Sequence, residues 1–326
     1  MRKGPHAMSC RAAKIVPLLL LPVLVCSTAS AAAPLLYITN QDEGSVSVID
    51  TANDANVATL TVGPGPAMIA ASTNGRRLYV THPEQGKLTI LDNQSLGSPK
   101  VIDVTGTPFG VAAAPDGRIY VSDWNRNLVT VLDGENGAKL AEIPVGLAPA
   151  QVAVSPLNRR VFVANREGDS VSVIDTDRLI VIATVTVGRA PFAVAVSPRG
   201  DRIYVANVQS SDLSVLSAES LEQLGTARVG AMPYGVAVAP SGERVLVANQ
   251  QSGTVNVVDT PSLVVTHRER VGRYPENIVM HPDGSKAYVV NWMSGDISVL
   301  NGETGRELKR LKAGDGARGL AIVPLD

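Results

Sequence analysis

The chain has 326 residues, of which 45% are hydrophobic and 18% charged, as expected for a globular protein. The 29 basic residues nearly balance the 30 acidic ones, which argues against a protein built mainly to coat a polyanion. Aromatic residues make up only 4% and small side chains dominate, so we expect a fold in which strands crowd closely.

The N-terminal segment has the pattern of a secretory signal peptide. Its basic residues, with no acidic one among them, are Arg2, Lys3, Arg11 and Lys14. An apolar run at 15–26 and small residues at 27–33 follow, and the run is short for a membrane span. We predict cleavage near Ala31 and a periplasmic or secreted protein. Lipid attachment at Cys26 is the alternative, disfavoured because Val25 is large for such a site.

Removal of residues 1–31 changes the chemistry of the mature chain. Four basic residues are lost, which leaves 25 against 30 acidic residues and a net charge of −5. Both cysteines, Cys10 and Cys26, are also lost. The mature protein therefore has no thiol for a disulfide, a metal or nucleophilic catalysis, and we expect no membrane span in it.

A tetrapeptide of the type Tyr-Val-Ala-Asn recurs seven times after the leader. Its copies begin at Tyr37, Tyr79, Tyr120, Phe162, Tyr204, Leu246 and Tyr288, at intervals of 41 or 42 residues. Each unit reads as four strands: an Ala/Val strand, the tetrapeptide strand, an alternating strand such as 170–175, and a strand ending in Val-Gly. Four strands in about 40 residues indicate a β-propeller blade, so the fold class is all-β with seven blades.

The two ends of the chain predict how the ring closes. The chain enters at a second strand, 36–40, and ends with an unpartnered first strand, 319–323. We predict that this last strand completes the first blade, because pairing removes both exposed sheet edges. Residues 32–326 then form one seven-bladed domain, which we expect to be a monomer.

The tetrapeptide, the Ser-Val-Ser-Val-Ile-Asp strand at 170–175 and the Pro-x-x-Val-Ala-Val-Ser-Pro-x-Gly turn near 191–200 resemble the YVTN-repeat β-propeller family. The resemblance covers essentially residues 35–325 and implies the fold. Exported relatives include proteins similar to accessory factors of quinone-cofactor (PQQ) dehydrogenase pathways and one single-stranded DNA binder. Lactonase-type propellers are more distant relatives.

The repeat places two sets of loops on one face, which we call the loop face: those after each tetrapeptide Asn and those around each Val-Gly-x-x-Pro. Six aromatic residues that the repeat does not require fall there: Phe109, Trp124, Phe192, Tyr234, Tyr274 and Trp292. Other blades carry Ala67, Ala150, Glu276 and Ala317 where Phe109 stands. The aromatic residues either plug the mouth of the ring or form a ligand surface, since exposed aromatics are good anchors.

Charged residues on the same loops add binding candidates. Arg126, Arg166 and Arg318 are placed to meet a carboxylate or phosphate through paired hydrogen bonds. His82 replaces the tetrapeptide Asn beside Glu84 and is the only candidate acid–base histidine. The repeated aspartates, such as Asp175, we interpret as turn caps rather than metal ligands. We predict no metal site and no cofactor.

Four functions follow from these features. The preferred one is a non-enzymatic binding or scaffold propeller that recognises a protein, peptide or small molecule on the loop face. An accessory role in a PQQ-dependent pathway rests on the resemblance alone. A lactonase-like hydrolase or lyase would use His82 and a nearby carboxylate. Single-stranded DNA binding suits aromatics beside arginines, but the net charge of −5 disfavours it.

Overall fold

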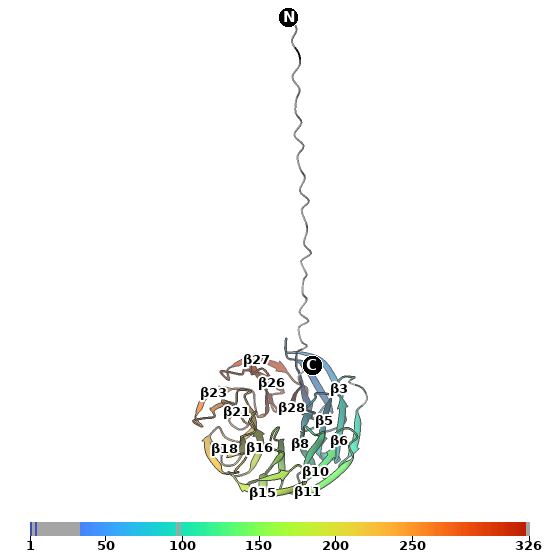
Figure 1. The fold of residues 1–326 in the computed structure, drawn as a ribbon, viewed down its shortest axis with the longest axis vertical. Coiled ribbons are helices and arrows are strands. Elements are labelled where there is room, and N and C mark those ends of the chain that lie inside the picture. The colour runs from blue at the N-terminus through green and yellow to red at the C-terminus, as the bar shows by residue number, and fades with distance from the viewer. Residues whose placement is uncertain (2–3, 5–32, 96, 98, 324–326) are drawn as a thin grey trace. The chain divides into compact units, whose positions relative to one another are not determined.

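The computed structural model describes residues 33–323 except 96 and 98, together with residues 1 and 4. The predicted signal peptide and Cys26 therefore lie outside the described residues, apart from those two isolated positions. From residue 35 onward the chain forms seven antiparallel sheets of four strands each, arranged in a ring (Figure 1). The predicted seven-bladed propeller is confirmed.

The strands of each blade are given from the ring axis outward. Blade 1 consists of β28 (Ala317–Val323), β1 (Leu35–Asn40), β2 (Ser45–Asp50) and β3 (Ala55–Thr61). Blade 2 consists of β4 (Ile69–Ala71), β5 (Arg77–His82), β6 (Lys87–Asp92) and β7 (Lys100–Asp103). Blade 3 consists of β8 (Pro108–Ala113), β9 (Arg118–Asp123), β10 (Leu128–Asp133) and β11 (Lys139–Pro144). Blade 4 consists of β12 (Pro149–Val154), β13 (Arg160–Asn165), β14 (Ser170–Asp175) and β15 (Ile180–Thr186).

Blade 5 consists of β16 (Pro191–Val196), β17 (Arg202–Asn207), β18 (Asp212–Ser217) and β19 (Gln223–Arg228). Blade 6 consists of β20 (Pro233–Val238), β21 (Arg244–Asn249), β22 (Thr254–Asp259) and β23 (Val265–Arg270). Blade 7 consists of β24 (Pro275–Met280), β25 (Lys286–Asn291), β26 (Asp296–Asn301) and β27 (Glu307–Lys312). Two short 3-10 helices, η1 (Pro83–Gln85) and η2 (Arg166–Gly168), lie in loops that follow the second strands of blades 2 and 4.

The position of a strand within its blade explains its composition. The first strands of neighbouring blades contact one another in a closed circle, β28–β4–β8–β12–β16–β20–β24. Small Ala and Val side chains suit this crowded centre. The tetrapeptide strands are buried on both faces, and their aromatic residues are almost fully buried between blades, as predicted. The outermost strands alternate between exposed and half-buried residues because one face meets solvent.

The ring closes as predicted from the chain ends. Strand β28 pairs antiparallel with β1, with Val323 opposite Leu35 and Leu320 opposite Ile38. The first blade therefore takes its innermost strand from the C-terminal end and its other three from the N-terminal end. In Figure 1 β28 lies near the axis, while β3 lies on the circumference.

The registers confirm which loops share a face. Pro149 at the start of β12 lies opposite Asn165 at the end of β13, and Pro191 lies opposite Asn207 in the next blade. The loops before each first strand and after each second strand therefore lie at the same end of the blade, which is the predicted loop face. The turn aspartates lie at the other end, where Asp175 accepts backbone N–H bonds from Asp177 and Arg178. Their predicted capping role is confirmed.

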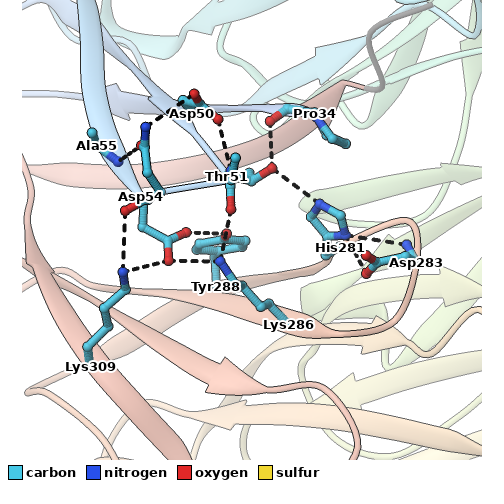
Figure 2. A network of polar contacts seen from close by, with 12 residues as sticks. Pro34, Asp50, Thr51, Asp54, Ala55, His281, Asp283, Lys286, Tyr288 and Lys309 are labelled. Carbon is cyan, nitrogen blue, oxygen red and sulfur yellow. Dashed lines mark hydrogen bonds and ion pairs between the residues drawn. The ribbon is translucent and has the colours of Figure 1, made fainter. Parts of the chain in front are cut away.

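The interface between blade 7 and blade 1, which we call the closing seam, carries a polar network at the end of the blades away from the loop face (Figure 2). Asp54 accepts hydrogen bonds from Tyr288 Oη at 2.6 Å and Lys286 Nζ at 2.9 Å, and Lys309 Nζ lies 2.8 Å away. Beside it, Thr51 Oγ1 donates to the Pro34 carbonyl at 2.7 Å. The carboxylate of Asp54 is 1% exposed, so its contacts are almost entirely internal.

At the closing seam, Lys286 donates a hydrogen bond to the next blade, as arginines at the equivalent position do in other blades. Its Nζ donates to the Thr51 carbonyl at 2.8 Å. In blades 5 and 6, Arg202 donates to the Thr260 carbonyl and Arg244 to the Glu303 carbonyl, both at 2.9 Å. The first residue of the second strand thus joins each of these blades to the outer turn of the next one, and the last blade repeats the contact with the first.

Candidate functional site

The centre of the loop face is built from one residue of each blade, the residue that follows the loop proline. These residues are Ala67, Phe109, Ala150, Phe192, Tyr234, Glu276 and Arg318. The expectation that Ala317 occupies this position was wrong. Ala317 lies opposite Asn40 just as Pro275 lies opposite Asn291, so Ala317 replaces the proline and Arg318 is the seventh member.

Three aromatic members of this set and Trp124 form one cluster, which we call the axial cluster. Phe109 lies 5.4 Å from Trp124 and 5.6 Å from Phe192 between ring centroids, both edge to face. Phe192 lies 4.3 Å from Tyr234. The structure therefore brings together four of the six aromatic residues singled out in the sequence, from blades 3, 5 and 6.

Burial divides the axial cluster into a support and a surface. Phe109 and Phe192 are 7% and 6% exposed and belong to a hydrophobic core, so they close the mouth of the ring. Trp124 and Tyr234 are half-buried and pack against that core from outside. The burial of Phe109 and Phe192 agrees with the plug interpretation, whereas Trp124 and Tyr234 remain partly exposed.

A polar chain borders the axial cluster on the side of blades 6, 7 and 1. Arg318 Nε donates to Glu276 at 3.1 Å, and Arg318 Nη1 donates to Gln41 at 3.0 Å. Gln250 Nε2 donates to the other carboxylate oxygen of Glu276 at 3.0 Å. Burial raises the pKa of Glu276, while the Arg318 charge and the two hydrogen bonds oppose that rise. The guanidinium of Arg318 also lies over Phe109, 5.7 Å from the ring centroid.

Gln41 and Gln250 are site residues that the sequence reasoning missed. Each directly follows the last residue of the tetrapeptide, as Trp124, Arg166 and Trp292 do in other blades. Aligning the seven repeats at this position would have found both. Arg166 in turn lies 5.6 Å from the Trp124 ring centroid, which stacks a cation on the aromatic surface.

Tyr274 and Trp292 form a separate pair on blade 7. Their ring centroids are 6.4 Å apart, and they are 37% and 39% exposed. The neighbouring Met293 is 46% exposed. This is the most open apolar surface among the six aromatic residues that the sequence singled out, and its exposure is what a contact with another molecule requires.

Arg126 does not join the axial cluster. Its guanidinium lies 3.2 Å from Glu142 on the outermost strand of blade 3, and 3.8 Å from Asp123. The side chain is 38% exposed. The three arginines singled out in the sequence therefore divide into two beside the aromatic rings, Arg166 and Arg318, and one at the rim.

His82 makes structural hydrogen bonds to its own loop and does not pair with Glu84. Its Nδ1 lies 2.8 Å from the Pro64 carbonyl and its Nε2 lies 2.9 Å from Thr89 Oγ1. The residue is 3% exposed, and burial lowers the pKa of its imidazole. Glu84 is exposed in η1 and makes no hydrogen bond to His82 among the described residues. The imidazole thus replaces the tetrapeptide Asn, which elsewhere ties down the same loop through its amide, as Asn165 does with Ser170 and Ser172.

Within residues 33–323, as far as the structure describes them, no group of three or more His, Cys, Asp or Glu side chains is arranged to hold a metal ion. No helix in the described part of the chain is long and apolar enough to cross a membrane.

Comparisons with known proteins agree on the architecture. A family model described as "Lactonase, 7-bladed beta-propeller" matches residues 178–263, about a quarter of the chain. The structure is similar to Kuenenia stuttgartiensis hydrazine synthase, with a TM-score of 0.75 and 19% identity, over 86% of this chain and 99% of that one. It is also similar to a functionally unknown protein from Desulfotomaculum acetoxidans DSM 771, with a TM-score of 0.78 and 17% identity, over 90% and 100%. At these identities the likeness shows the fold alone. No curated protein matches the sequence.

Proposed function

We propose that this chain is an exported, non-catalytic binding propeller that recognises its partner or ligand through the aromatic residues of the loop face. The observation that carries the proposal is the gathering there of all six aromatic residues that the repeat does not need, four of them half-buried or exposed. Both tryptophans of the protein, Trp124 and Trp292, are among them. Exposing large aromatic rings to water has an unfavourable free energy. Burying such rings against a partner is a common source of binding energy.

The surface is chemically mixed, which suits specific recognition. Trp124 and Tyr234 present ring faces near the axis, Arg166 supplies a cation on Trp124, and Tyr274 and Trp292 extend the surface across blade 7. Aromatic and arginine side chains are the types that most often carry binding energy at interfaces. The signal-peptide pattern at 1–31 supports an exported protein, in which this recognition would take place outside the cytoplasm.

A lactonase-like activity is the second candidate, because the matching family model carries that description. The geometry of His82 does not favour it. Its ring nitrogens are both engaged by internal hydrogen bonds, and Glu84 is not among its partners. The axial carboxylate, Glu276, is also occupied by Arg318 and Gln250. A PQQ-pathway role and single-stranded DNA binding rest on the repeat resemblance and remain alternatives to be tested.

The test starts from the mature chain, residues 32–326, purified from its native compartment with whatever accompanies it. Mass spectrometry identifies the companion, and affinity is then measured by isothermal titration calorimetry, because the variant below removes both tryptophans of the chain and with them any tryptophan fluorescence signal. We expect a Trp124→Ala/Trp292→Ala variant to weaken binding roughly tenfold or more, as for hot-spot residues.

Leu157→Ala is the matched control, because Leu157 is a 69% exposed apolar residue in the first-to-second-strand turn of blade 4, away from the loop face. It should bind as tightly as the wild-type chain. Equal affinity of the double tryptophan variant and the control would contradict the proposal. Hydrolysis of lactones by the purified chain, lost in a Glu276→Gln variant, would favour the enzyme instead.

A further inference from the structure

A cavity of about 460 Å³ lies on the loop face at the junction of blades 6 and 7. Three arginines from different segments line it: Arg270 at the end of β23, Arg273 in the loop before β24, and Arg310 on β27. The other lining residues are uncharged and include Gln251, Ser252 and Tyr274. Three guanidinium groups around one cavity, with no carboxylate in its lining, form an unbalanced positive site.

The pairing of each arginine shows how much of this charge is free. Arg310 is partly neutralised, since Glu307 lies 2.8 Å away and Asp296 lies 3.7 Å away. The Arg273 guanidinium donates to the Met293 carbonyl at 3.2 Å and makes no ion pair with any described residue, so its charge is unopposed. Arg270 is exposed and has no ion pair within the described part of the chain. Two of the three charges are therefore available to a ligand.

Blade 6 differs from its two neighbours, blades 5 and 7, in the residue that lies opposite this cation. In blade 5, Asp212 lies opposite the equivalent cation, Arg228, across the strand pair. In blade 7, Asp296 lies opposite Lys312 in the same way. Of the three blades that carry a cation at this position, blades 5, 6 and 7, blade 6 alone has no acidic residue opposite it, because Thr254 lies opposite Arg270.

We infer that this cavity is a binding site for a small multivalent oxyanion, a compound bearing phosphate or carboxylate groups. Guanidinium groups present paired N–H donors that match both kinds of oxyanion. Clustered like charges repel one another, so an anion that bridges them binds more strongly than to one isolated arginine. Tyr274, 37% exposed at the edge of the cavity, offers a ring face to the remainder of the ligand.

The inference rests on the proposed function, because it assigns a ligand chemistry to one part of the same face. Gln250 connects the two regions: it lines the cavity and donates to the buried Glu276 of the axial polar chain. The cavity is nevertheless separate from the axial cluster, since Trp124 and Phe192 do not line it.

The experiment is calorimetric titration of the mature chain with sodium phosphate and with sodium citrate, at constant ionic strength against sodium chloride. We expect saturable binding of one of them. The ion that binds with the higher affinity shows whether phosphate or carboxylate is the recognised group. Arg270→Gln and Arg273→Gln should each weaken that binding roughly tenfold, the loss of one charge-assisted contact. Both side chains are exposed, so neither change should lower the melting temperature.

Arg228→Gln is the matched control, because it removes the equivalent arginine of blade 5, which faces Asp212. It should leave the affinity unchanged. Absence of saturable binding of both ions, or an equal loss in the Arg228 variant, would overturn the inference. Much tighter binding of a single-stranded oligonucleotide would also overturn it as a small-molecule site. If only the anion titration fails while the tryptophan variants still lose their partner, the proposed function stands without this site.

Discussion

Replacing Asp54 by Asn tests whether the polar network of the closing seam holds the ring together. Asp54 has φ of 58°, a left-handed conformation that Asn tolerates well, so the substitution removes the charge without straining the backbone. The amide can still accept a bond from Tyr288 Oη, but it no longer compensates Lys286 and Lys309. The change therefore isolates the charge of one carboxylate.

The expected cost follows from the burial of the partners. Removing one member of a buried ion pair costs about 3–5 kcal/mol. Here the carboxylate is 1% exposed, but Lys286 and Lys309 are 24% and 45% exposed and can turn toward water. We therefore expect a loss of about 2 kcal/mol in the free energy of unfolding. With an unfolding entropy of about 0.6 kcal/mol/K for a domain of about 290 residues, this lowers the melting temperature by about 3 °C.

The assay is differential scanning calorimetry of both proteins over a range of pH. Burial opposes ionisation of Asp54, but hydrogen bonds from Lys309, Tyr288 and Lys286 outweigh it and lower its pKa. A carboxyl group whose pKa is lowered on folding stabilises the protein above its unfolded pKa, and this contribution is lost as pH falls through the folded value. The difference between the two proteins should thus persist down to about pH 4 and shrink below it.

The control is Asp133→Asn, which removes the same charge from an exposed turn cap in blade 3 that binds the N–H groups of Glu135 and Asn136. An Asn side chain can keep that cap, so we expect almost no change in melting temperature. Equal shifts in the two variants would refute the reasoning, as would a difference that disappears already at neutral pH.

Three further outcomes follow. Deleting Gly319–Asp326 removes most of β28 and exposes the edge of β1, so scanning calorimetry and gel filtration should show severe destabilisation or aggregation; an unchanged melting temperature would be incompatible with the closure. Phe109→Ala should cost roughly 3–4 kcal/mol in denaturant unfolding because the ring is buried, whereas Trp292→Ala should cost less than about 1 kcal/mol. His82 has a lowered pKa and stabilises the fold when neutral, so the wild type should lose stability relative to His82→Asn as pH falls below about 6.5; parallel pH profiles would argue against this.

The features that recur in every blade are the ones the sequence predicts. A position that recurs seven times at a constant spacing can be assigned from the sequence. The blade count, the strand order and the burial of Tyr288 therefore follow from the spacing. The error at Ala317 has a physical origin in the same reasoning. The last unit lacks the proline that marks the start of the first strand, and only the pairing of Ala317 with Asn40 shows that Arg318 belongs to the central set.

The contacts of the candidate site were harder to predict from the sequence, because many of them join different blades. Arg318 and Glu276 are 42 residues apart and meet because β24 and β28 are neighbours at the axis. Arg126 instead meets Glu142 through the register of one blade, where Glu142 lies opposite Thr130. Repeat position places Arg318, Glu276 and Arg126 on the loop face, but the distances and the choice of partner depend on strand register and rotamer.

The closing seam also bears on why the ring has seven blades. The turn position held by Asp54 is Leu179, Leu221 and Leu263 in blades 4, 5 and 6, all with the same left-handed backbone. Those leucines pack into the apolar interfaces between blades, whereas Asp54 meets Lys286 and Lys309 of blade 7.

Against blade 3, 4 or 5, Asp54 would lack the partner Lys309, because Ala141, Ala183 and Gly225 hold the equivalent position. A buried carboxylate that loses a cationic partner is destabilised. The first blade is therefore matched to the seventh and mismatched to blades 3, 4 and 5, whose surfaces the three leucines contact. The charges at the closing seam favour closure at the correct blade, while the β28–β1 pairing supplies most of the contact.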